Sequence, residues 1–105
     1  MAIATAPNLA ERIVATLRAH EAELRGAGIR RLSLFGSAAR GEAGRDSDID
    51  LAAEFDPSAR MDLIRLAALE RRIGETLGRT VEILPEPAEN PRLRANLERD
   101  RVVAF

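Results

Sequence analysis

The stretch FGSAARGEAGRDSDIDL, residues 35–51, is the most informative part of this chain. It contains a Gly36-Ser37 pair, a polar loop and two aspartates, Asp48 and Asp50, separated by one residue. On a strand, alternate side chains point to the same face, with Cα atoms about 6.5–7 Å apart. The two carboxylates should therefore converge, which is unfavourable unless a cation lies between them. Such oxygen ligands suit Mg²⁺, which usually takes one or two carboxylates together with substrate phosphates.

The Gly36-Ser37 pair adds the features of a phosphate site. A glycine directly after a strand lets the backbone approach a ligand closely, and amides at the start of a helical turn attract phosphate. We expect Ser37 to cap that turn, and either Arg40 or Arg45 could pair with a polyphosphate. An isolated D-x-D is more often a polar turn that enters an edge strand, but the combination predicts a site for a nucleoside triphosphate with Mg²⁺.

The residues around this stretch predict a small α/β domain. Apolar spacing and turn residues indicate helices over 8–25 and 59–77, the second with Leu63 among the positions that face the core, and a last helix from Asn90-Pro91 to about residue 100. Strands are predicted over 29–35, 48–55 and 80–84, with the state of 101–105 left open. We expect one domain, 1–105, with a sheet of at least three strands covered by helices.

Composition excludes several classes of function. The net charge is −1, from 16 basic and 17 acidic residues, so no overall field attracts nucleic acid. All 16 basic residues are arginine, so phosphate contacts must come from guanidinium groups or the backbone. No apolar run is long enough to span a membrane, and the N-terminus lacks the pattern of a signal peptide. The absence of cysteine fits a cytoplasmic location.

GSAARGEAGRDSDIDL resembles the G-S-x10-D-x-D signature of the nucleotidyltransferase superfamily related to DNA polymerase β, and most closely that of the minimal nucleotidyltransferases (MNT proteins). The strand GRTVEILPEP and the ending NPRLRANLERDRVVAF are placed as in that family. The resemblance implies a polymerase β palm-like mixed sheet that binds ATP and Mg²⁺. It matches Gly36 and Ser37 to the phosphate-holding pair, and Asp48 and Asp50 to the metal-binding pair.

The resemblance also implies a partner and a reaction. Many MNT proteins are antitoxins that pair with a helical HEPN-domain ribonuclease toxin and transfer AMP from ATP to a tyrosine of that toxin. The family usually has a third carboxylate, most often Asp, where this chain has Glu82. Glu82 could bind metal or accept the proton of the attacking hydroxyl, or it could be a solvated strand residue.

Two other functions stay open at this stage. The Glu82 substitution is compatible with an antitoxin that acts by complex formation alone, and adenylyl transfer to a small molecule is a third possibility. In the last helix, Arg92 and Arg99 lie on nearly the opposite face from Arg94 and Arg101. With Glu98 and Asp100 between them, this pattern indicates a solvated helix that could contact an acidic protein, rather than a nucleic-acid stripe.

Overall fold

The computed structural model describes residues 8–105, in which helices and strands follow one another largely in the predicted order. The elements are α1 (Leu9–Ala19), α2 (Glu21–Gly26), β1 (Ile29–Phe35), α3 (Gly36–Ala39), β2 (Ile49–Phe55), a 3₁₀ turn (Pro57–Ala59), α4 (Leu63–Leu77), β3 (Val81–Pro85), α5 (Pro91–Asp100) and β4 (Val102–Val103). No helix among these residues is long and apolar enough to cross a membrane.

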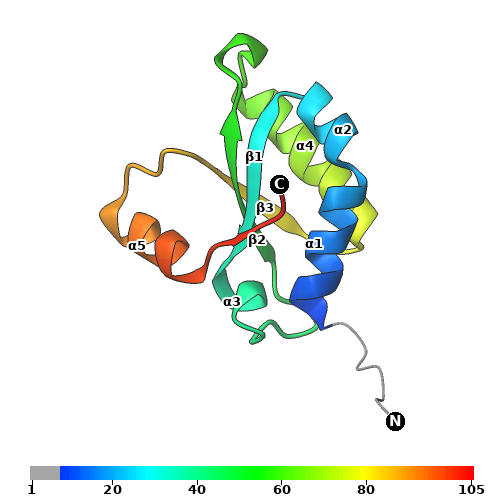
Figure 1. Ribbon diagram of the computed structural model, residues 1–105, viewed down its shortest axis with the longest axis vertical. Helices are drawn as coiled ribbons and strands as arrows, with labels where there is room; N and C mark the ends of the chain where they lie inside the picture. The colour runs from blue at the N-terminus through cyan, green and yellow to red at the C-terminus, as the bar shows by residue number, and fades with distance from the viewer. Residues whose placement is uncertain (1–7) are drawn as a thin grey trace.

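The strands form one mixed sheet in the order β3-β2-β1-β4, which confirms the predicted α/β fold (Figure 1). β1 runs antiparallel to both β2 and β4, whereas β2 and β3 are parallel. The C-terminal tail, whose state the sequence left open, supplies the fourth strand. It pairs Val102 and Val103 with the middle of β1.

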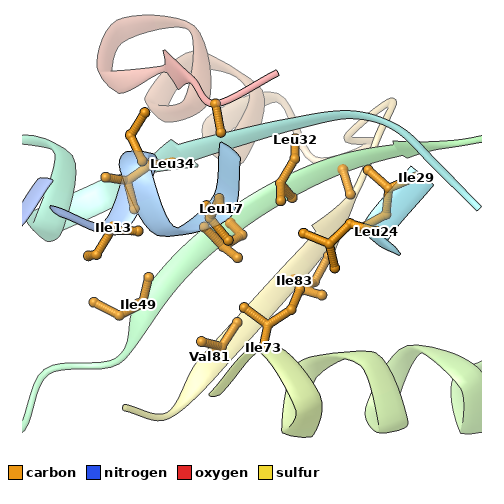
Figure 2. Close-up of a cluster of buried hydrophobic side chains, with 14 of the residues drawn as sticks. Ile13, Leu17, Leu24, Ile29, Leu32, Leu34, Ile49, Ile73, Val81 and Ile83 are labelled. Atoms are coloured by element: carbon orange, nitrogen blue, oxygen red, sulfur yellow. The ribbon is translucent and has the colours of Figure 1, made fainter. Parts of the chain in front are cut away.

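One face of the sheet carries the main core. Alternate positions of β1, β2 and β3 are fully or almost fully buried there against α1, α2 and α4 (Figure 2). Figure 2 shows side chains from these helices meeting those of the strands: Ile13, Leu17, Leu24 and Ile73 from the helices, with Leu32, Leu34, Ile49, Val81 and Ile83 from the sheet. The period-2 burial of the strands explains why Asp50 and Glu82 point to the other face.

The opposite face is covered only in part. Helix α5 lies on that side, away from α1 and α4 (Figure 1). Leu97 of α5 packs there against Phe35 and Ala52, with Leu84 beside them. The remainder of this face, near the end of β1 and the start of β2, is left for polar side chains.

A partly buried ion pair joins the end of α5 to the sheet. Arg101 donates two hydrogen bonds to the carboxylate of Glu86, at 2.9 and 2.7 Å, and a third to the hydroxyl of Ser33 at 2.9 Å. Both charged side chains are less than one-fifth exposed, and Ser33 is fully buried. The network fixes the chain just before β4 to the face that α5 covers.

Two predicted helices begin or end differently from the sequence expectation. The helix over 8–25 is interrupted at His20, whose φ of −106° and ψ of 15° separate α1 from α2. Helix α4 begins at Leu63 rather than 59, because Arg60 adopts a left-handed conformation and Asp62 caps the amide of Arg65 at 2.8 Å. Leu63 is 83% exposed and does not face the core.

Candidate active site

The sheet brings two carboxylates together on its partly open face. Asp50 of β2 lies opposite Phe35 of β1 on one side and opposite Glu82 of the parallel strand β3 on the other. Because the register is direct, the side chains of Asp50 and Glu82 occupy neighbouring positions on one face. Gly36, the residue that follows β1, lies at the same end of the sheet. The strand pairing therefore places the Gly36-Ser37 turn beside both carboxylates.

Gly36 approaches Asp50 so closely that no side chain fits between them. A Cβ atom on Gly36 would overlap Oδ2 of Asp50 and lie 3.2 Å from its Cγ and 3.3 Å from its Cβ. Gly36 also has φ of +75°, a conformation that glycine adopts readily and other residues rarely. Glycine is required here both by the backbone conformation and by the contact.

A cleft of about 420 Å³ lies over these residues, between the sheet, α3 and α5. One part of it is polar and one part is apolar, as expected for a site that holds both a charged and an uncharged group. Its lining consists of Phe35, Gly36, Ser37, Arg40, Asp50, Glu82, Ile83, Leu84, Leu93, Asn96 and Asp100.

The carboxylate of Asp50 is electrostatically perturbed by its surroundings in the cleft. Partial burial raises the pKa of Asp50 above its ordinary value, and the negative charges of Glu82 and Asp48 raise it further. The nearby positive charge of Arg40 acts in the opposite direction. Like charges held close together in this way are stabilised by a bound cation.

These carboxylates fit a divalent cation that takes its remaining ligands from other molecules. Asp48 precedes β2 directly, and its charge acts on Asp50 as described. Among residues 8–105, no three His, Cys, Asp or Glu side chains converge closely enough to enclose a metal ion by themselves. Magnesium commonly takes only one or two carboxylates, and substrate phosphates and water supply its remaining ligands.

The structure gathers most, but not all, of the sequence-predicted residues in this cleft. Gly36, Ser37, Arg40, Asp50 and Glu82 line it.

Asp48 is exposed and lies outside the strand, because β2 begins at Ile49 and not at residue 48 as predicted. Asp48 does not line the cleft, but its negative charge acts on Asp50. Arg45 does not line this cleft and lies in the loop after α3, where its carbonyl accepts a 2.7 Å hydrogen bond from Arg79.

The predicted cap of the short helix is also wrong. Helix α3 begins at Gly36, with Phe35 at the N-cap position and no side chain bonded to the first amides. Ser37 is thus the second residue of the helix rather than its cap. The helical hydrogen bonding already includes Gly36, whose carbonyl accepts from the amide of Arg40 at 3.2 Å.

Sequence reasoning missed the contribution of α5. Leu93, Asn96, Leu97 and Asp100 share one helix face by their spacing of three and four residues, and this face is turned towards the sheet. The charge pattern of the sequence indicates a solvated position for Asp100, yet its side chain is only 2% exposed. Hydrogen bonds from Arg99 and Arg40 keep the pKa of Asp100 below its ordinary value despite this burial. The spacing of these four residues is the sequence signal that indicates a face of α5 turned towards the sheet.

Comparison with known proteins agrees with this architecture. The family model described as "Nucleotidyltransferase domain" matches residues 17–104. The chain belongs to this nucleotidyltransferase family, which confirms the resemblance found in its sequence. It is 39% identical over 77 residues to the protein adenylyltransferase MntA of Thermococcus cleftensis, a match that covers 70% of this chain and 74% of that protein.

Solved structures share the fold of this nucleotidyltransferase. One that is assigned as a minimal nucleotidyltransferase superposes with a TM-score of 0.73 at 33% identity, over 94% of this chain and 98% of the other. A complex of tri-AMPylated Shewanella oneidensis HEPN toxin with MNT antitoxin matches with a TM-score of 0.64 at 17% identity, over 88% and 71% of the two chains. At that identity the second match supports the fold alone.

Proposed function

We propose that this nucleotidyltransferase is a protein adenylyltransferase that transfers AMP from ATP to a tyrosine hydroxyl of a HEPN-domain toxin and thereby neutralises it. The observation that carries the proposal is the contact of Gly36 with Asp50, with Glu82 in register on the next strand. This arrangement puts a backbone that can approach phosphates beside two carboxylates. The relatives support the acceptor class, since MntA of Thermococcus cleftensis is a protein adenylyltransferase.

In this proposal the nucleotide lies along the cleft with its triphosphate at the α3 end. The backbone of Gly36 and Ser37, together with the hydroxyl of Ser37, holds the phosphates, and Arg40 adds a positive charge. Asp48 and Asp50 would hold Mg²⁺, which would supply positive charge to offset the negative charge of the phosphates. The raised pKa of Asp50 fits this role, because partial burial and the charges of Glu82 and Asp48 disfavour the ionised carboxylate, and a bound cation would favour it.

The transfer is a substitution at the α-phosphorus of ATP. The tyrosine oxygen forms a bond to this phosphorus while the bond to the oxygen bridging the α- and β-phosphates breaks, and pyrophosphate leaves with that bonding pair. The hydroxyl proton passes to a carboxylate of the cleft. Glu82 is the candidate, because it lines the cleft next to Asp50 and is exposed enough to reach an incoming hydroxyl.

The proposal includes a hetero-oligomer with the toxin. Similar folds occur in complexes of MNT antitoxins with HEPN toxins. A phenol presented by a protein must enter an open cleft, and this cleft lies on the face of the sheet that α5 leaves partly uncovered. The geometry therefore admits a side chain from a second protein.

The test separates catalysis from simple binding. Co-expression of the chain with its HEPN partner should relieve the toxicity of the partner, and Asp48→Asn combined with Asp50→Asn should abolish that relief. The complex itself should persist, because neither aspartate is needed for the core. Relief that survives the double substitution would instead favour neutralisation by complex formation alone. AMP found on a small molecule, with the partner unmodified, would favour adenylyl transfer to a small molecule.

A further inference from the structure

Asp100 is a buried carboxylate at the edge of the cleft to which the proposed mechanism gives no task. It is the last residue of α5, and its side chain is 2% exposed. Its Oδ2 accepts a 2.6 Å hydrogen bond from Nη1 of Arg40, and its Oδ1 accepts one of 2.9 Å from Nε of Arg99. A carboxylate this buried is retained only when its charge is paired and its oxygens are bonded.

Arg40 connects this carboxylate to the phosphate end of the cleft. It directly follows α3, and its amide donates to the carbonyl of Gly36 at 3.2 Å, so it lies one helical turn from the proposed phosphate site. Its guanidinium has five N–H groups. One bonds to Asp100 and one, on Nε, bonds to Glu42 at 3.0 Å. Three N–H groups are not used by these two bonds.

The two carboxylates that hold Arg40 differ in rigidity. The side chain of Glu42 is 64% exposed and lies in the loop after α3. Asp100, in contrast, belongs to a helix that is fixed to the sheet by Leu97, which is 2% exposed and packs on Phe35 and Ala52. Asp100 is therefore the fixed point of the pair.

We propose that Asp100 is a positioning residue, which holds the guanidinium of Arg40 at the cleft so that its remaining N–H groups bind the phosphates of the nucleotide. This inference rests on the proposed function, because it assumes that the cleft binds a nucleoside triphosphate. It assigns α5 a role in the reaction beyond packing. It also explains why a carboxylate, which by itself would repel a polyphosphate, lies beside the phosphate end of the cleft.

Nucleotide binding is the direct test, measured by calorimetry with a non-hydrolysable ATP analogue and Mg²⁺. Asp100→Asn should raise the Kd about ten-fold, because a hydrogen-bonded charge that orients Arg40 is lost. Arg99→Gln is the matched control: it removes the other partner of the same carboxylate but lies outside the cleft, and the Kd should stay within about two-fold. In an Arg40→Gln background, Asp100→Asn should have no further effect on the Kd.

Steady-state transfer distinguishes positioning from a general loss of structure. Asp100→Asn should raise the KM for ATP and leave kcat within about two-fold, whereas partial unfolding would lower the active fraction and hence kcat. If Asp100→Asn does not fold, Arg40→Lys replaces it. A single ammonium bonded to Asp100 cannot also supply the fork of N–H groups, so the Kd should again rise.

An unchanged Kd in Asp100→Asn, or in Arg40→Lys where that variant is used, would overturn the inference, as would a chain that binds no nucleotide. A rise in the Kd of Arg99→Gln as large as that of Asp100→Asn would also overturn the inference. Failure of the proposed function has a different signature: the parent chain would bind the nucleotide, and Asp100→Asn would weaken that binding, but no AMP would reach the toxin.

Discussion

Replacing Gly36 by alanine should strongly slow transfer while leaving most of the stability intact. The new Cβ would overlap Oδ2 of Asp50 and lie 3.2 Å from its Cγ, so the carboxylate must move. Active-site geometry tolerates about 0.5 Å of displacement, and a shift of about 1 Å can cost 100-fold in rate. We therefore expect Gly36→Ala to lower the rate of AMP transfer about 100-fold or more.

Gly41→Ala is a matched control for the backbone effect of this substitution. Gly41 has the same φ of +75°, but a Cβ there would meet nothing within 4 Å. Both variants should lose about 1–2 kcal/mol of unfolding free energy, measured in urea, because an L-residue in the left-handed region is strained. Only Gly36→Ala should lose transfer, measured with labelled ATP and the HEPN partner. Equal transfer rates in the two variants would refute the role of the Gly36–Asp50 contact.

Three further predictions concern Glu82, Asp50 and Arg101. Glu82→Gln should slow transfer about 100-fold or more if this carboxylate accepts the tyrosine proton, and a rate within about three-fold of the parent would assign Glu82 to the solvated surface. Burial and the charges of Glu82 and Asp48 raise the pKa of Asp50 in the native state. The free energy of unfolding therefore falls as the pH rises through that raised pKa, because ionised Asp50 destabilises the native state. Asp50→Asn should therefore raise the melting temperature at pH 7, although transfer is lost. This increase in melting temperature should vanish below the ordinary pKa of aspartate. A lower melting temperature at pH 7 would contradict the prediction. Arg101→Ala should lower the unfolding free energy by about 2 kcal/mol, since it leaves the partly buried Glu86 unpaired, whereas exposed Arg92→Ala should change it by less than about 0.5 kcal/mol in urea denaturation.

Local signals in the sequence located the strands that carry the site. The prediction of β1 over 29–35 agrees with the structure, because a short apolar run ends at a glycine there. Asp50 and Glu82 were placed on strands by the same reasoning, and the strand register then puts them side by side. That register depends on the parallel pairing of two strands separated by α4, which no local pattern encodes.

The errors arose where distant contacts or backbone conformation decide the outcome. Asp100 looks like one charge among several in a polar helix, and only the docking of α5 on the sheet buries it against Arg40. Leu63 fits the apolar spacing of α4, but it lies in the first turn, where the helix has no buried position. The predicted Ser37 cap is wrong because the helix begins at Gly36, and the local sequence does not distinguish Gly36 from Ser37 as its first residue.

The most direct test of the central claim is the mass of the HEPN partner after incubation with this chain, ATP and Mg²⁺. We expect the partner to gain the mass of one or more AMP groups, located on tyrosine by peptide fragmentation, and Asp50→Asn to add none. A partner that stays unmodified while its toxicity is suppressed would show that this chain does not act by AMP transfer.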